Sequence, residues 1–236
     1  MPGDRGPIYF ETVMGRFPVE PWNTASNLLF LALIIYWFVR VRGDFAAHRF
    51  IAYSLPVLLI GWAGGTVYHA TRSHNVWLFL DFGPIALLVL AVAVFFWRRQ
   101  GVAWWWVPAL VLGPAALIFP LMLAIPDAAR PFVGYGTLAL SILLPVTRYL
   151  AGTRWVDLSL VAAALAVFAM AIAFRGLDAR MAIAFLPMGT HWLWHSLGAG
   201  AVHLFILLIF RSDLRETARE FQRSYGQAGR AFPQTQ

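Results

Sequence analysis

Long apolar stretches separated by short polar segments dominate the chain. Seven apolar runs occupy residues 22–39, 50–68, 76–97, 102–125, 132–150, 155–174 and 182–210. A helix needs about 20 apolar residues to cross the hydrocarbon of a bilayer, and most of the runs are close to that length. The pattern therefore predicts an all-α integral membrane bundle of seven transmembrane helices, formed by one domain over residues 22–210.

Two polar segments flank this domain. Residues 1–21 contain several charged side chains and lack the apolar core and small-residue cleavage site of a signal peptide, so we expect a retained N-terminal tail. Residues 211–236 begin with Arg211, Arg215 and Arg219 at helical spacing. This spacing predicts a basic surface helix that frays by Gln227.

The composition supports a membrane protein and narrows its chemistry. Of the 236 residues, 60% are hydrophobic and only 12% are charged. Cysteine is absent, which excludes disulfides and thiolate sites, so any metal must be held by nitrogen and oxygen ligands. Lysine is also absent, which excludes a retinal Schiff base.

The arginines predict how the chain lies in the membrane. They sit at the ends of the apolar runs, which argues for contact with anionic lipid headgroups and against a nucleic-acid surface. One side of the predicted bundle holds six of the 18 basic residues, and the other side holds the remaining twelve; the six are Arg5, Arg16, Arg72, Arg130, Arg175 and Arg180. The positive-inside rule then places the N-terminus outside and the C-terminus in the cytoplasm of a multi-pass protein of the cell (inner) membrane.

Ionisable residues that are rare inside membranes cluster at the predicted outer ends of three helices. His69 directly follows the second run, Asp81 lies early in the third, and His191 and His195 share one helix face in the seventh. An unpaired aspartate at such a position costs about 2.5–3.5 kcal/mol, so Asp81 should have a partner. We therefore expect these four side chains to meet at one depth.

Three histidines with an open fourth position form the ligand set of a hydrolytic zinc site. In this interpretation His69, His191 and His195 bind zinc, and Asp81 orients or deprotonates the attacking water. The alternative is a buried hydrogen-bond network that only holds three helices together.

A polar face opens the first predicted helix. Asn23, Ser26 and Asn27 follow the i, i+3, i+4 spacing that puts side chains on one helix face. We expect them to support the metal ligands from the neighbouring helix. Alternatively, they form only an N-cap with a polar collar.

Three blocks of the sequence resemble the alkaline ceramidases and, more distantly, the progestin and adiponectin receptors, a superfamily of seven-helix membrane hydrolases. The blocks are Glu11 with Glu20-Pro-Trp-Asn-Thr-Ala-Ser-Asn27, His69 with Asp81-Phe-Gly-Pro84, and His191-Trp-Leu-Trp-His195. The resemblance implies that the three histidines bind zinc and that the aspartate assists the attacking water. It also implies cleavage of the ceramide amide to sphingosine and a fatty acid.

The resemblance further implies a calcium site at the N-terminal end, where Glu11 and Glu20 stand in place of two acidic ligands. Calcium takes six or more oxygen ligands, and the tail offers only Asp4 as a further carboxylate. One position departs from the family. The serine four residues before the first zinc histidine is Gly65 here, so either the neighbouring Thr66 supplies the catalytic hydroxyl or that contribution is missing and the substrate differs.

The sequence thus predicts a zinc-dependent membrane amidohydrolase that cleaves ceramide or a related N-acyl lipid drawn from the bilayer, with its active site toward the extracytoplasmic face. The first alternative is a seven-helix receptor or signalling protein with a structural zinc and no turnover. The second is a haem-binding electron carrier, although two histidines on adjacent turns suit one small ion better than the two faces of a porphyrin.

Overall fold

The structure is a computed structural model that describes residues 3–127, 129–178 and 186–228. Within these residues the helices are α1 (Pro21–Ser26), α2 (Leu28–Val41), α3 (Arg49–Thr71), α4 (Asn75–Arg99), α5 (Val107–Ala124), α6 (Arg130–Gly152), α7 (Leu158–Leu177) and α8 (His191–Ala228). Helices α1 and α2 follow each other directly, so they cross the bundle as one rod.

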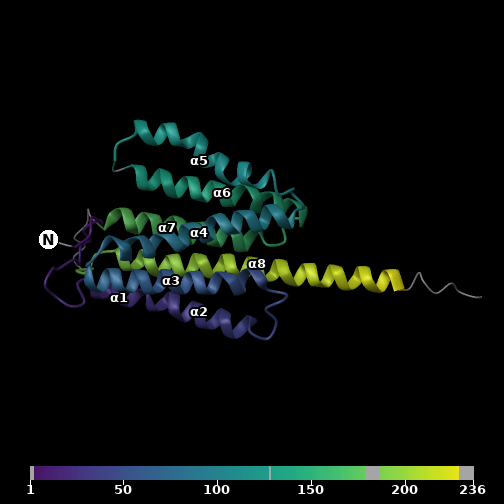
Figure 1. The fold of residues 1–236 in the computed structure, drawn as a ribbon, viewed down its shortest axis with the longest axis horizontal. Helices are drawn as coiled ribbons and strands as arrows, with labels where there is room; N and C mark the ends of the chain where they lie inside the picture. The colour runs from purple at the N-terminus through teal and green to yellow at the C-terminus, as the bar shows by residue number, and fades with distance from the viewer. Residues whose placement is uncertain (1–2, 128, 179–185, 229–236) are drawn as a thin grey trace, which may run out of the picture.

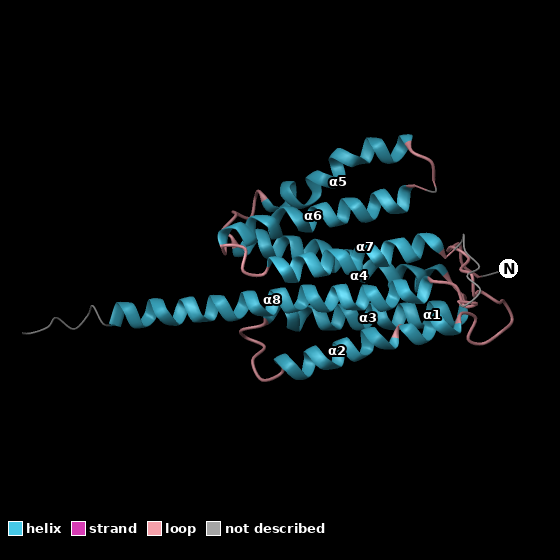
Figure 2. Cartoon of the chain, turned by 180° about the vertical axis from the view of Figure 1, so that it is seen from behind, coloured by secondary structure: helices cyan, strands magenta, loops and turns pink. Residues whose placement is uncertain are grey.

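The helices lie side by side in one bundle (Figure 1). Helices α3, α4, α7 and α8 occupy its middle, and α2 and α5 lie at opposite edges in both views (Figures 1 and 2). The N-terminus lies at one end of the bundle, and α8 extends beyond the other end (Figure 1). The N-terminal segment and the end of α8 are therefore separated by the length of the bundle.

Seven helical segments are long and apolar enough to cross a membrane, with α1 and α2 counted as one segment, Pro21–Val41. They coincide with the seven predicted runs, which confirms the all-α class and indicates a multi-pass membrane protein. The sidedness of the termini stays a prediction.

Helices α5 and α8 begin later than the predicted runs. Helix α5 begins at Val107 because Trp104–Trp106 form an exposed turn before it. Helix α8 begins at His191, and the predicted residues 182–185 lie outside the described residues. The helix then continues through Arg211 to Ala228, so the predicted tail helix is a direct extension of the last span and not a separate element.

The main apolar core is built from residues of α2, α3, α4, α6, α7 and α8. Its almost completely buried side chains include Trp37 of α2, Phe96 of α4, Val146 of α6 and Leu208 of α8. These residues lie in the half of the bundle that α8 extends beyond. The other half contains the candidate site.

Candidate metal centre

The three predicted histidines meet in the interior of the bundle. His69 comes from the last turn of α3, and His191 and His195 come from the first turns of α8. All three are buried, their ring centroids lie 4.6 to 5.3 Å apart, and each offers a ligand atom within 4.8 Å of the others. Among the described residues this is the group whose side chains are arranged to hold a metal ion.

Hydrogen bonds at Nδ1 fix the tautomers of two of these rings. His69 donates from Nδ1 to Glu20 Oε2 at 2.5 Å, and His195 Nδ1 lies 3.2 Å from the Asn23 carbonyl, which only accepts. Both rings therefore carry the proton on Nδ1 and present a bare Nε2. A metal-binding histidine commonly has its second nitrogen bonded in this way to a carboxylate or carbonyl.

Two of the Nε2 atoms are buried without a partner that the structure describes. In the described part of the chain, Nε2 of His69 and Nε2 of His191 are buried without a hydrogen-bond partner. Buried polar atoms without a partner are rare and need an explanation. Three imidazole nitrogens without a thiolate are a ligand set that zinc accepts, so the residues present are suited to that ion.

The start of α8 is positioned by a carboxylate that the sequence did not reveal as part of the site. Asp178 follows α7 and accepts hydrogen bonds from the backbone N–H groups of Thr190 at 2.6 Å and His191 at 2.8 Å. Its other oxygen accepts from the N–H of Phe10 at 3.0 Å. Asp178 therefore fixes the first turn of α8, and with it His191, against the N-terminal segment.

The predicted N-terminal tail packs over this end of the bundle. Its backbone pairs with the end of α3, with the N–H of Val19 donating to the Ala70 carbonyl at 2.9 Å and that of Glu20 donating to the His69 carbonyl at 3.0 Å. The ring of Tyr9 stacks on His191 with centroids 3.7 Å apart. Burial raises the pKa of the Tyr9 phenol, so it stays protonated.

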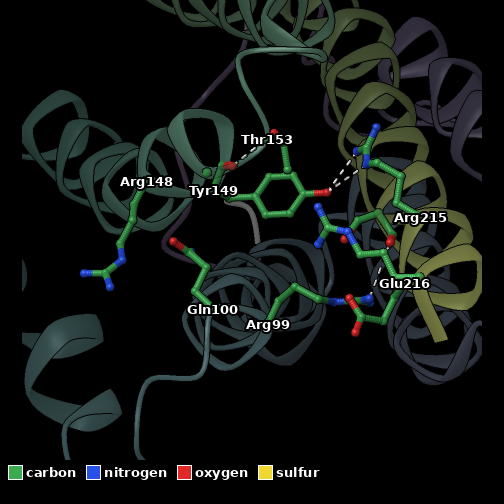
Figure 3. Close-up of a pocket in the computed structure, with 10 residues that line it drawn as sticks. Arg99, Gln100, Arg148, Tyr149, Thr153, Arg215 and Glu216 are labelled. Carbon is green, nitrogen blue, oxygen red and sulfur yellow. Dashed lines mark hydrogen bonds between the residues drawn. The ribbon is translucent and has the colours of Figure 1, made fainter. Parts of the chain in front are cut away.

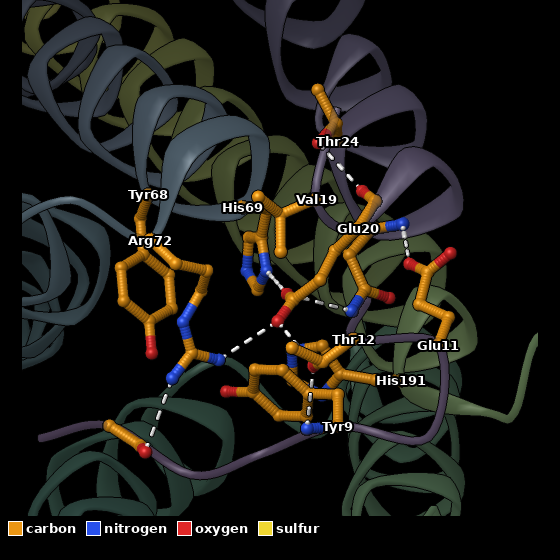
Figure 4. A network of polar contacts seen from close by, with 12 residues as sticks. Tyr9, Glu11, Thr12, Val19, Glu20, Thr24, Tyr68, His69, Arg72 and His191 are labelled. Atoms are coloured by element: carbon orange, nitrogen blue, oxygen red, sulfur yellow. Dashed lines mark hydrogen bonds and ion pairs between the residues drawn. The ribbon is translucent and has the colours of Figure 1, made fainter. Parts of the chain in front are cut away.

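A buried ion network anchors the same segment (Figure 4). Arg72 is 0% exposed and donates to both oxygens of Asp4 at 2.9 Å and to Glu20 Oε1 at 2.8 Å. Burial alone would raise the pKa values of both carboxyls. The hydrogen bonds from Arg72 to Asp4 and from His69 to Glu20 outweigh it, so both pKa values are lowered.

The two glutamates of the predicted calcium site have protein donors. Glu11 accepts from the backbone N–H groups of Trp22 and Asn23 and so caps α1, and burial raises its pKa despite these bonds. Glu20 bonds His69, Arg72 and the Thr12 hydroxyl. The calcium site stays a prediction.

The polar face of the first span contacts the candidate centre through His195. The Ser26 hydroxyl lies 2.8 Å from His195 Nδ1 and donates to the Asn23 carbonyl, and the amide of Asn27 donates to the same carbonyl at 3.1 Å. These contacts join the first span to α8 at the level of the histidines.

Asp81 lies beside the histidines at the end of an apolar cavity of about 290 Å³. Its Oδ2 is 3.9 Å from His69 Nε2. The lining follows α4 from Asp81 to Val89, a length of roughly 12 Å at the helical rise. Phe82 lines the cavity and is also 53% exposed, so the wall reaches the lipid-facing surface of α4.

Gly65 and Thr66, four and three residues before His69, differ in their relation to this cavity. A Cβ atom added at Gly65 would overlap Oδ1 of Asp81, so the glycine provides the space that the carboxylate occupies. Thr66 is not among the described residues that line the cavity, and its buried hydroxyl has no hydrogen-bond partner among them. Its catalytic role stays a prediction.

Arg175 is a cavity residue that sequence reasoning treated only as an interfacial charge. Helix α7 extends past the predicted end of its run, which brings Arg175 inside the helix and into the cavity wall. Its guanidinium lies 3.5 Å from His191 Nδ1 and 5.3 Å from the ring centre of Trp194. The position of Arg175 directly after an apolar run was the feature of the sequence that could have marked it as a cavity residue. No feature of the sequence marked Tyr9 as part of the site.

Comparison of the sequence with models of known protein families gives no match, and comparison with curated proteins gives no significant match. The ceramidase resemblance therefore rests on the three blocks, and the geometry of the site carries the functional argument.

Proposed function

We propose that this protein is a zinc-dependent membrane hydrolase that cleaves the amide bond of ceramide or a related N-acyl lipid. The observation that carries the proposal is the buried trio His69, His191 and His195, with partnerless Nε2 atoms on two of the rings, beside Asp81 at the end of an apolar cavity. A bound zinc ion would supply Lewis acidity, which polarises a carbonyl and acidifies water.

Different residues of the chain would act on different atoms of the reacting amide and the water. Asp81 lies where its carboxylate can accept a proton from the attacking water. The same proton can pass to the nitrogen as the carbon–nitrogen bond breaks, so the products are a fatty acid and an amine. Tyr9 and Arg175 line the cavity and provide hydrogen-bond donors near that end.

The shape of the cavity supports an acyl-lipid substrate. Its wall is mostly apolar, and its polar lining residues include Tyr9, Asn27, Asp81, Arg175 and His195. An acyl chain placed along α4 would bring its carbonyl end to Asp81 and the histidines. The exposed face of Phe82 offers entry from the bilayer.

The proposal is tested by metal analysis of the purified full-length protein together with a screen of N-acyl lipids in mixed micelles. We expect about one zinc per chain, loss of the metal in His195→Ala, and retention in the control His74→Asn. His74 is exposed and only caps α4, through a bond from the Val76 N–H to its ring.

Asp81→Asn separates catalysis from metal binding. The amide cannot take the water's proton, so we expect zinc to stay and turnover to fall by roughly 10²–10⁴-fold. Stoichiometric zinc without hydrolysis of any lipid in the screen would instead favour the receptor alternative. Wild-type protein that binds no transition metal would contradict both.

A further inference from the structure

A second cavity of about 400 Å³ lies at the other end of the bundle and is lined by four arginines (Figure 3). We call it the arginine pocket; Arg99 comes from the last turn of α4, Arg148 from α6, and Arg215 and Arg219 from α8. From His191 to Arg215 helix α8 rises roughly 36 Å, which is more than the roughly 30 Å of the hydrocarbon core. The pocket is therefore separate from the metal centre and lies where two spans end.

Two of the four arginines are held in place by buried carboxylates. Arg99 forms an ion pair with Asp213, and Arg215 forms one with Asp157. Arg215 also donates to the Tyr149 hydroxyl at 2.9 Å (Figure 3). These contacts give the inner wall of the pocket a fixed geometry.

The other two arginines form no ion pair with any residue that the structure describes. Arg148 and Arg219 are exposed, and within the described residues neither has a hydrogen bond or an ion pair. Asp213 and Asp157 already pair with Arg99 and Arg215, so the one carboxylate of the lining, Glu216, stands against two unpaired guanidinium groups. The pocket thus has an excess of positive charge.

Ser212 is a further residue of the lining. Ser212 is only 2% exposed, and its hydroxyl has no hydrogen-bond partner in the described part of the chain. The Tyr149 hydroxyl accepts from Arg215, so its own proton remains available for an acceptor. A ligand with several acceptor oxygens would use both hydroxyls together with the guanidinium groups.

We propose that the arginine pocket binds the phosphate of an anionic phospholipid headgroup. Guanidinium groups bind phosphate oxygens through paired, charge-assisted hydrogen bonds, and basic pockets between helices at the membrane surface bind lipid headgroups. Leu144 lies one helical turn before Arg148 on the same face of α6 and is 52% exposed. A lipid whose phosphate contacts Arg148 would lay its chains along Leu144, which is why a lipid suits the pocket better than a free phosphate compound.

The test measures retention of phosphatidylglycerol by the full-length protein. Protein is taken from nanodiscs of phosphatidylcholine with and without phosphatidylglycerol, and bound lipid is counted by native mass spectrometry. The pocket variant Arg148→Gln/Arg219→Gln should bind phosphatidylglycerol roughly 30-fold more weakly, because each arginine near the surface contributes about a factor of five. The control Arg42→Gln/Arg223→Gln removes the same charge from exposed arginines outside the pocket and should bind like wild type.

Ser212→Ala keeps every charge and should still weaken retention several-fold. Equal weakening in the pocket and control variants would reduce the effect to general surface charge and overturn the proposal, as would wild-type protein that retains no phosphatidylglycerol. A third arm adds sn-glycerol 3-phosphate to protein in neutral detergent. Thermal stabilisation by this soluble compound that Arg148→Gln/Arg219→Gln abolishes, without phosphatidylglycerol retention, would assign the pocket to a free phosphate and overturn the lipid assignment.

Discussion

Replacing Glu20 with glutamine should weaken zinc binding by changing the tautomer of a ligand. Both carboxylate oxygens of Glu20 accept hydrogen bonds: Oε1 from Arg72 and Thr12, and Oε2 from His69 and Asn23. A glutamine has only one accepting oxygen. The charged guanidinium of Arg72 should hold the amide oxygen on its own side, so the amide NH₂ would face Nδ1 of His69.

An NH₂ group can bond Nδ1 only if that nitrogen gives up its proton. The proton would then move to Nε2, where it blocks the metal-binding position. Changes to groups that orient metal-binding histidines typically cost 10–100-fold in affinity, which is about 1.4–2.7 kcal/mol. The ion pair between Arg72 and Asp4 remains in this variant. We therefore expect the loss of folding stability to stay below the roughly 3–5 kcal/mol that follows when a buried ion pair is broken.

The assay is a competition titration of the purified protein with zinc and a chromogenic chelator. Glu11→Gln is the matched control, because it makes the same change in the same segment. The carboxylate of Glu11 accepts hydrogen bonds from the backbone N–H groups of Trp22 and Asn23. Arg16 donates to the backbone carbonyl of Glu11 and not to its carboxylate. Wild-type zinc affinity in Glu20→Gln would refute the tautomer argument. Equal losses in the two variants would point to general disturbance of the segment.

Three further predictions concern sidedness, the helix before His69 and acid stability. Ser73→Cys should react with an impermeant reagent from outside intact cells, and Gly43→Cys, where a side chain meets open space, should not. The reverse labelling would invert the predicted orientation. Gly65→Ser should lower the rate of hydrolysis with zinc retained, because the new Cβ would overlap Asp81. Thr66→Val should lower the rate by much less than the 10²–10³-fold that follows the loss of an oxyanion donor, because Thr66 is not among the described lining residues. A rate loss of that full size would give Thr66 the catalytic role. The pKa of Asp4 is lower in the folded state, so its charged form favours folding above the unfolded-state pKa of about 3.9, and this contribution disappears as the pH falls through the folded-state pKa. The difference in thermal stability between wild type and Asp4→Asn should therefore vanish in acid, and a difference that persists there would contradict the argument.

Hydrophobic pattern was sufficient to predict the spans and to bring the histidines to one level. A run near 20 apolar residues has few alternatives in a bilayer, and His69, His191 and His195 lie at fixed distances from the ends of their runs. Helical spacing also predicted one shared face for Asn23, Ser26 and Asn27; the first two contact His195, whereas Asn27 bonds the Asn23 carbonyl.

The N-terminal segment was not predictable from the same rules. It has no period and many charges, which are typical of a solvated tail, yet Asp4 and Glu20 pair with an arginine that is completely buried. Such pairing depends on contacts between distant parts of the chain, which periodicity does not encode. The extent of α7 was missed for a related reason, since a charged residue marks the end of an apolar run even when the helix continues through it, as at Arg175.

The packed N-terminal segment also has a kinetic consequence for the proposed hydrolase. The buried network around Arg72 covers the histidine end of the bundle, whereas the cavity wall reaches the lipid-facing surface at Phe82. For a substrate that arrives by this route, the concentration that determines the rate is the amount per area of membrane and not the amount per volume of water. Adding inert phospholipid at constant total substrate should then slow the reaction by surface dilution, and the Michaelis constant should be expressed as a mole fraction in the bilayer.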